Sequence, residues 1–349
     1  MKNKKKRIKK KVSLKAKRVF ILILSIFVLG EGLGMFLLYG PYPEFRNLLI
    51  TTAMTTKSHQ YLARWWFDED EISKVMANNY MVEVDEDTNE EHIDFESEDV
   101  EDASNKYEKQ VLDHDKDDIY KVIYVNELGY NGYVVAVYDA SKVKIGTTSK
   151  LGSTGQSLKV IAKKNKASVA VNASGFYDPD WNSNGAIPHG TVIQNGKVVY
   201  DYDDAKVGGG FVGFNKDNVL MLGRWTKEQA LKKGLRDAIE FGPFLIVNGK
   251  KSFVKGDGGW GIAPRTAIGQ RKDGIVIMAV INGRGKNGSI GIDMVGLTAL
   301  MEKFGCYNAA NMDGGSSSAI VVKGKVTNSP CAGGEEGLRN IPTAWIVTE

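Results

Sequence analysis

The chain has 349 residues, of which 42% are hydrophobic and 25% charged, an ordinary composition for a globular protein with attachments. Eleven of its 46 Lys and Arg residues precede Val19 with no acidic residue among them, which leaves 35 bases against 42 acids in the rest. The net charge of +4 therefore comes from an N-terminal tail, and the pattern excludes a nucleic-acid-binding surface spread over the folded part.

A hydrophobic segment follows the basic tail. Residues 19–38 are apolar except for Glu31 and small residues, and about 20 such residues span a bilayer as a helix. Because the preceding bases favour the cytoplasm, we predict a basic cytoplasmic tail over residues 1–18, a single transmembrane anchor over residues 19–39, and an extracellular C-terminal domain. A cleaved signal peptide is the alternative; the sites with small residues near Gly32 fit it poorly, because apolar residues continue past them.

Residues 40–118 are predicted to be a stem and an acidic spacer. The stem, residues 48–79, has a mixed helical pattern with Trp65-Trp66-Phe67 near its middle. Residues 83–118 are rich in acids and show little periodicity, which predicts a solvated, flexible spacer.

From residue 119 onward, short apolar runs alternate with turn signals. Asn195-Gly196 and Asn248-Gly249 each separate two apolar strands, and Asn-Gly favours a type I′ turn because both central residues need positive φ. Four hairpins are predicted, over residues 191–200, 244–254, 266–281 and 319–326.

Helices are few in this region. Patterns of apolar residues and capping signals predict helices over residues 157–165, 226–234 and 294–304. Many strands with few helices, not in strict alternation, predict an α+β domain over residues 119–349, with a mixed or antiparallel sheet core and several hairpins.

The strongest local signal is Asn311-Met312-Asp313-Gly314-Gly315-Ser316. Asp313 comes where a strand ends, and the two glycines let a ligand approach the backbone closely. The following serines offer hydroxyl and N–H donors, so the segment suits a polyol or phosphate ligand. The residues alone leave a second interpretation open, a tight turn whose Asp caps its own backbone.

Two other segments carry candidate ligand-binding residues. Arg265 immediately precedes a strand, and its guanidinium can bind a phosphate; a surface salt bridge is the usual alternative for a lone arginine. Gly175 and Phe176 follow a strand in a turn of small residues, where aromatic rings beside polar groups often stack on sugars. Core packing is the alternative for Phe176.

Metal and thiol chemistry receive little support. Asp180, Asn182 and Asn184 match the start of a calcium-loop pattern, but Thr191 stands where a bidentate Glu is expected. Calcium is therefore a weak alternative, and no other cofactor is expected. The pairing of Cys306 with Cys331 stays open, because sequence does not establish their geometry.

Taken in order along the chain, these motifs resemble the phosphodiester glycosidase domain family over about residues 120–349. No single motif is decisive, but their joint order is specific. The matching segments are residues 171–177, 190–197, 243–250, 264–269, 281–284, 311–317 and 324–330.

The resemblance implies hydrolysis of a sugar-1-phosphodiester in a cell-envelope or exopolysaccharide glycan. It implies catalytic roles for Asn172, Arg265 and Asp313, with Arg265 holding the phosphodiester and Asp313 acting on the anomeric centre or its attacking water. The expected substrate-binding residues are Gly175, Phe176, Asn282, Arg284, Asn311, Gly314, Gly315, Ser316 and Asn328.

One position departs from the family. Members commonly have Asp-Gly-Arg where this chain has Asn282-Gly283-Arg284. If that carboxylate is catalytic in relatives, a non-catalytic glycan-binding or assembly module is the alternative function. Asp237, Glu240 and Asp257 are candidates for a second carboxylate, and their spacing does not choose among them.

Overall fold

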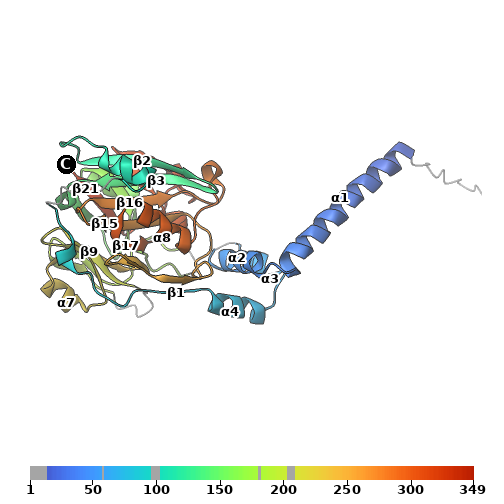
Figure 1. The fold of residues 1–349 in the computed structure, drawn as a ribbon, viewed down its shortest axis with the longest axis horizontal. Coiled ribbons are helices and arrows are strands. Elements are labelled where there is room, and N and C mark those ends of the chain that lie inside the picture. Colours follow the sequence, from blue (N-terminus) through green and yellow to red (C-terminus); the bar gives the residue numbers. More distant parts are fainter. Residues whose placement is uncertain (1–13, 57–58, 96–102, 180–181, 203–208) are drawn as a thin grey trace, which may run out of the picture.

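The computed structural model describes residues 14–56, 59–95, 103–179, 182–202 and 209–349. Figure 1 shows a long N-terminal helix that leads through a group of short helices into a β-rich globular body.

The long helix is α1 (Leu14–Tyr39), and by length and composition it is able to cross a membrane. The stem that follows is helical, as predicted, but divided into α2 (Pro43–Met54), α3 (Tyr61–Arg64) and α4 (Glu69–Asn78). Ile50, Ala63, Phe67 and Ile72 form a small core shared by these helices.

The largest sheet has the strand order β13-β12-β17-β15-β16-β3-β2. Every pairing in it is antiparallel. Its strands are β2 (Tyr120–Glu127), β3 (Tyr130–Val137), β12 (Phe244–Val247), β13 (Lys250–Lys251), β15 (Arg265–Arg271), β16 (Val276–Ile281) and β17 (Cys306–Met312).

Two five-stranded antiparallel sheets pack with it, in the orders β19-β18-β6-β21-β4 and β10-β9-β11-β7-β8. The first contains β4 (Val143–Thr147), β6 (Ala167–Asn172), β18 (Ile320–Val322), β19 (Lys325–Val326) and β21 (Thr343–Thr348). The second contains β7 (Val192–Gln194), β8 (Lys197–Tyr200), β9 (Gly210–Asn215), β10 (Leu220–Gly223) and β11 (Leu235–Phe241). Two short pairs complete the sheets, β1 (Tyr80–Val82) with β14 (Phe253–Lys255) and β5 (Gln156–Ser157) with β20 (Asn340–Ile341).

The predicted hairpins are confirmed as the pairs β7–β8, β12–β13, β15–β16 and β18–β19. Asn195 and Gly196 have φ angles of 52° and 70°, and Asn248 and Gly249 have 51° and 75°. Both turns therefore have the two positive φ values that a type I′ turn requires.

The predicted helices are confirmed as α6 (Leu158–Lys164), α7 (Lys227–Lys232) and α8 (Met294–Lys303). Thr226 and Gln229 form a capping box at α7, and the Asp293 side chain accepts from the Gly296 N–H at α8. Single-turn 3₁₀ helices are η1 (Glu90–His92), η2 (Ala140–Lys142), η4 (Lys286–Gly288), η5 (Gly315–Ser317) and η6 (Glu335–Gly337).

The two largest buried clusters among the described residues stabilise the globular body. The first lies between the three large sheets and includes Phe214, Phe244, Ile268 and Trp345. The second joins the largest sheet to α8 and to α5 (Lys106–Leu112). The cores fix β6, β15 and β17 relative to one another, and these strands carry the candidate site.

The spacer differs from its prediction of a flexible, solvated segment. The Val84 N–H donates to the Ser252 hydroxyl at 3.2 Å, and the Thr88 N–H donates to the Leu222 carbonyl at 2.9 Å. Ile93, Tyr107 and Val111 are buried against the body. The acidic composition predicted a solvated segment. However, these apolar residues between the acids pack on the globular body, and their burial holds the segment against it. Residues 96–102 lie outside the described part.

Candidate active site

Three strand ends meet at Asp313. Strand β17 ends at Met312, which pairs with Thr266 of β15, and β6 of the neighbouring sheet ends at Asn172. The Asp313 N–H donates to the Ala173 carbonyl at 3.0 Å. The junction of two sheets therefore fixes the backbone of Asp313, and side chains distant in sequence are brought together.

Asn172 supports this junction from below. It is 1% exposed, and its side-chain amide donates to the Asp313 carbonyl at 2.6 Å. Its Oδ1 accepts from the Thr266 hydroxyl at 2.7 Å and from the Ala319 N–H at 3.1 Å. Since the amide is occupied by these three contacts, Asn172 positions the Asp313 turn and does not line the cavity.

The glycine pair after Asp313 admits two arginines. A Cβ atom on Gly314 would lie 3.2 Å from Nη1 of Arg265, and one on Gly315 would lie 3.1 Å from Nη2 of Arg284. Gly315 also has a φ of 58°, which disfavours other residues. The two glycines thus leave room for both guanidinium groups close to the backbone.

Arg265 is buried beneath the turn. Its Nη2 donates to the carbonyls of Trp260 and Gly261, the latter at 2.8 Å, and no described carboxylate forms an ion pair with it. Burial lowers the pKa of Arg265 to about 10, against the charges of nearby Asp residues, so it stays a cation at neutral pH. The buried positive charge of Arg265 favours the presence of an anion on the side of the Asp313 turn.

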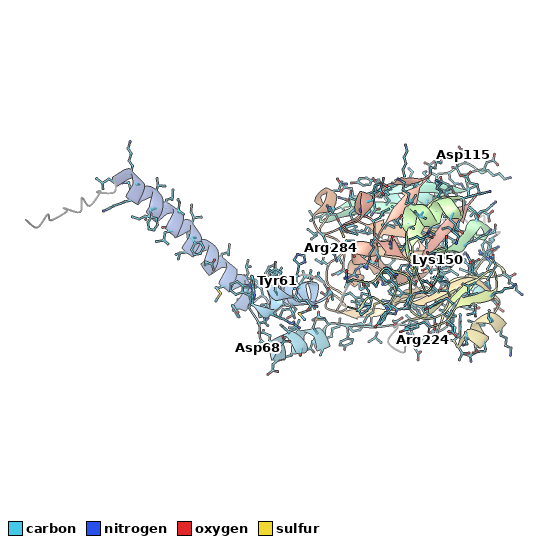
Figure 2. All side chains as sticks on the ribbon, turned by 180° about the vertical axis from the view of Figure 1, so that it is seen from behind. Tyr61, Asp68, Asp115, Lys150, Arg224 and Arg284 are labelled. Carbon is cyan, nitrogen blue, oxygen red and sulfur yellow. The ribbon has the colours of Figure 1, made fainter. Side chains whose placement is uncertain are left out.

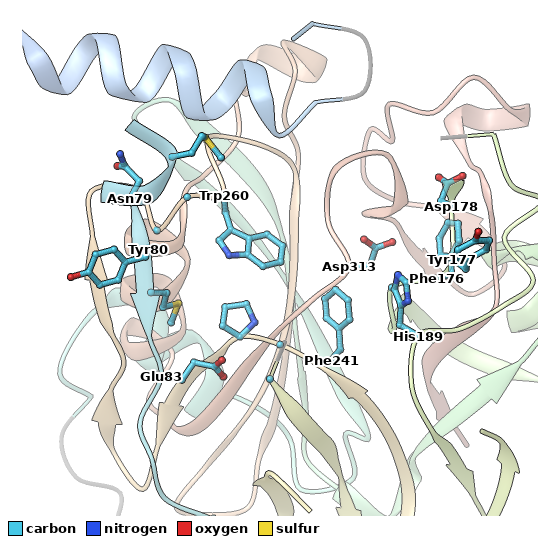
Figure 3. A pocket seen from close by; sticks show the side chains of 18 of the residues that line it. Asn79, Tyr80, Glu83, Phe176, Tyr177, Asp178, His189, Phe241, Trp260 and Asp313 are labelled. Carbon is cyan, nitrogen blue, oxygen red and sulfur yellow. The ribbon is translucent and has the colours of Figure 1, made fainter. Parts of the chain in front are cut away.

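A cavity of about 1000 Å³ opens in front of Asp313. Figure 3 shows Asp313 between one wall with Trp260 and Tyr80 and another with Asp178 and His189. The aromatic rings of Phe176, Tyr177, Tyr202, Phe241 and Trp260 line it together with Asp178, Arg339 and Glu83. Such a mixture of rings and polar groups suits a sugar with an attached anion.

Asp313 has the most perturbed acidity of the described carboxyl groups that line this cavity. Burial raises its pKa to about 6, although the Ser317 side chain and the charge of Arg339 act in the opposite direction. A carboxylate with this pKa ionises near neutral pH and is a strong base relative to an ordinary Asp.

Opposite Asp313, Asp178 and Arg339 form an ion pair. Nη2 of Arg339 lies 2.6 Å from the Asp178 carboxylate, and its guanidinium stacks 4.5 Å from the Phe176 ring centre. Burial alone would raise the pKa of Asp178, but the hydrogen bonds from Arg339 and Ser183 hold it below its ordinary value. Nη1 of Arg339 approaches the Ser316 hydroxyl at 3.4 Å, which links this wall to the Asp313 turn.

Comparison with known proteins identifies the domain that carries these features. A family model described as phosphodiester glycosidase matches residues 165–348, more than half of the chain. The chain belongs to the phosphodiester glycosidase family. The uncharacterized SPbeta prophage-derived protein YomE of Bacillus subtilis (strain 168) is 32% identical over 210 residues, 58% of this chain and 31% of YomE. The chain thus matches about a third of this relative's length.

A solved structure supports the same assignment at the level of the fold. The catalytic domain of zebrafish N-acetylglucosamine-1-phosphodiester alpha-N-acetylglucosaminidase, auto-inhibited by its pro-peptide, has a TM-score of 0.54. It is 20% identical, and the similarity covers 68% of this chain and 85% of that chain. The predicted α+β fold class is therefore confirmed.

In this phosphodiester glycosidase domain, none of the three carboxylates proposed from sequence as a second acid lines the Asp313 cavity. Asp237 pairs with Arg236 and accepts from the Ile145 N–H. Glu240 accepts from the Thr191 N–H, and Asp257 accepts from the Thr51 hydroxyl of α2. They organise the backbone, and the described carboxylates that line the cavity beside Asp313 are Asp178 and Glu83.

The other predicted asparagines are also buried away from the cavity. Asn282 is 1% exposed; it donates to Oδ1 of Asn131 at 2.8 Å and accepts from the Ser329 N–H at 2.8 Å. Asn311 donates to the Gly242 carbonyl at 2.9 Å, and Asn328 links Ser318 to Ile320. The amides of Asn282 and Asn328 both donate and accept, which suits these crossings between chain segments, whereas Asn311 only donates.

The remaining predicted residues divide between two places. Gly175 and Phe176 line the Asp313 cavity, and a Cβ on Gly175 would lie 2.4 Å from the Phe241 ring. Ser316 lies beside Arg339, whereas Arg284 is exposed on the other face of the glycine pair.

Cys306 and Cys331 are separate thiols. Burial raises the pKa of Cys306.

The calcium alternative falls partly outside the described residues, because Asp180 is not among them. Asn184 donates to the Ser153 carbonyl and accepts from the Ala186 N–H, which closes its own loop. Within the described ranges, no group of three or more His, Cys, Asp or Glu side chains is arranged to hold a metal ion.

Sequence reasoning missed Asp178, Arg339, Trp260 and the wall formed by the stem. Asp178 follows the aromatic pair Phe176-Tyr177, which was a usable signal. Arg339 and the stem residues lie in no motif, and only the fold brings them to the cavity.

Proposed function

We propose that the protein hydrolyses a sugar-1-phosphodiester in the Asp313 cavity, releasing the sugar and leaving a phosphomonoester. The observation that carries the proposal is Asp313 itself: a carboxylate with a pKa near 6 at the cavity surface, on a turn fixed by two sheets. Membership of the phosphodiester glycosidase family supports the reaction class.

Asp313, Arg339 and Arg265 have different roles in this reaction. Asp313 acts on the anomeric carbon or on the water that attacks it, and the phosphate leaves without needing a strong acid because it is already a good leaving group. Arg339, the arginine that lines the cavity, binds the phosphodiester. Arg265 is a positioning residue, since its guanidinium holds the Trp260–Gly261 carbonyls and supports Gly314 from behind.

The sugar binds between the aromatic rings. Trp260 and Phe241 lie on one side of Asp313, and Phe176 and Tyr177 lie on the other (Figure 3). Ring stacking on both sides orients the anomeric carbon toward the carboxylate. Asn282, with its amide occupied by Asn131 and Ser329, acts in this proposal as a structural residue.

The site works outside the cell on envelope or exopolysaccharide glycans. The eleven bases before Val19 favour a cytoplasmic N-terminus, so the body lies across the membrane from them. The end of α1 packs into the stem, where the Tyr39 hydroxyl donates to the Trp66 carbonyl and the Tyr39 ring lies 5.8 Å from that of Phe67. These contacts support a retained anchor.

The test uses the full chain in nanodiscs and a series of sugar-1-phosphodiesters, with the released reducing sugar as the readout. Asp313→Asn is expected to lower turnover by at least about 10³-fold, because the carboxylate is lost while the amide fits the same space. Asp217→Asn, an exposed acid remote from the cavity, is the matched control. Turnover by Asp313→Asn equal to that of the control would remove Asp313 from the mechanism. Glycan binding without release from any substrate would favour a binding module.

A further inference from the structure

A second cavity lies between the short N-terminal helices and the globular body. It has a volume of about 500 Å³ and shares no lining residue with the Asp313 cavity. Its lining is largely apolar, with Leu48, Leu49 and Ala53 from α2, Leu62 from α3, and Ile262 and Ile290 from the body. An apolar chain would be sheltered from water on both sides here.

Arg284 provides a cation at the body side of this cavity. It is exposed, and its Nη1 lies 3.6 Å from the Cys331 sulfur. Within the described ranges no carboxylate forms an ion pair with it. Its charge is therefore open to an anion at the end of an apolar cavity.

The cavity also lies at the membrane end of the molecule. Figure 2 places Arg284 on the side of the body that faces Tyr61 and the short helices at the end of α1. A set of aromatic side chains is exposed in this region: Tyr39, Tyr42, Phe45, Tyr61, Trp65 and Trp66. Exposed Trp and Tyr next to a spanning helix are typical of residues that sit at the headgroup level of a bilayer.

We propose that this cavity binds a membrane phospholipid, with one acyl chain between α2, α3 and the 262–290 region, and with the headgroup phosphate at Arg284. The apolar lining matches the acyl chain, and the guanidinium of Arg284 matches the phosphate. The exposed aromatic residues place both at the depth where a bilayer supplies a lipid. The proposal rests on α1 being embedded in a bilayer. It does not depend on turnover at Asp313.

The test is photo-crosslinking with the full chain in nanodiscs. The probe is a phosphatidylglycerol that carries a photoactivatable diazirine on an acyl chain, and crosslinked residues are mapped by mass spectrometry. We expect crosslinks on α2, α3, Ile262 or Ile290 as well as on α1. A diacylglycerol with the same chain is expected to label these positions about tenfold less, because it lacks the phosphate.

Variants separate the cavity from general surface contact. Ile290→Glu places a carboxylate beside the chain, and Ile290→Trp fills the space while staying apolar; each is expected to lower cavity labelling about tenfold. Ile290 is 56% exposed, so neither change disturbs the core. Val199→Glu, at a similarly exposed apolar residue of β8, is the matched control and should label like the unaltered protein.

Arg284→Gln should remove the preference for the phospholipid over the diacylglycerol, and Arg284→Lys should keep most of it. Labelling confined to α1, or unchanged cavity labelling in both Ile290 variants, would overturn the proposal. Crosslinks between two copies of the chain at the cavity would overturn it as well, in favour of a self-association surface. Absence of labelling on α1 would overturn the membrane placement on which it rests.

Discussion

Asp313 has a raised pKa because it follows the end of β17, where two sheets meet and bury it. Burial at the junction of two sheets raises its pKa to about 6, while the Gly314 N–H donates to its Oδ1 at 2.9 Å and keeps the side chain oriented. The ionised form is the one that can act as base or nucleophile. Activity, and the contribution of Asp313 to stability, should therefore both change with pH as this carboxyl group ionises.

For activity, we expect kcat/KM to rise with pH through about 6, because the carboxylate becomes ionised over that range. The measurement is the initial rate of sugar release between about pH 4.5 and pH 8 at low substrate concentration. A profile that is flat across this range, or that falls with rising pH, would contradict the assignment of Asp313 as base or nucleophile.

For stability, the folded-state pKa of Asp313, about 6, lies above its ordinary value of 3.8. The folded form thus binds the proton more tightly, and this favourable contribution is lost as pH rises through about 6. Asp313→Asn should raise the free energy of unfolding at pH 7 by up to about 3 kcal/mol, less the screening from partial exposure. Urea unfolding of both proteins at about pH 7 and about pH 4 checks this, since most of the difference should be lost at the lower pH.

At the scale of elements, the segment that directly follows α4 completes the cavity. Asn79, Tyr80, Met81 and Glu83 line it, and Glu83 accepts from the Phe244 N–H at 2.7 Å. Strand β1 is attached through β14, which lies outside the three large sheets. The part of the chain that follows α1 and the stem helices is therefore one wall of the site.

A fragment of residues 119–349 should accordingly be less stable than one of residues 40–349. It lacks Ile93, Tyr107 and Val111, whose burial together contributes roughly 5 kcal/mol to the free energy of unfolding. It also lacks the stem wall, so its activity should be strongly reduced. Thermal unfolding and sugar release of the two fragments make the comparison; equal stability would show that the segment is dispensable.

At the scale of the whole molecule, a series of contacts connects α1 to the globular body through the stem. Helix α1 ends at Tyr39, which packs on Trp66 and Phe67 of the stem, and α2 packs on the body through Thr51 and Asp257. Removal of α1 at a signal-peptide site would also remove these contacts of Tyr39.

We therefore expect the mature protein in membranes to keep α1. Intact-mass measurement of the purified membrane protein should include residues 1–39, and a C-terminal tag should be accessible to protease on unbroken cells. A mature N-terminus between residues 30 and 41 would instead identify α1 as a cleaved signal sequence.

The individual elements and the family are both predictable from the sequence alone. The turns at Asn195-Gly196 and Asn248-Gly249, the cap of α8 at Asp293, and the apolar span of α1 depend on neighbours within a few residues, and each is confirmed as an element. The order of the motifs identified the family because order is a property of the chain itself.

Only the tertiary structure decided which side chains face the cavity. Asn172, Arg265 and Asn282 belong to matching motifs but are buried behind the site, while Arg339 and the stem residues come to it from distant positions. The physical reason is that an amide or guanidinium can satisfy either a ligand or a buried backbone group. The pairing of strands across two sheets determines whether such a side chain meets a ligand or a buried backbone group. This pairing cannot be inferred from a local sequence pattern.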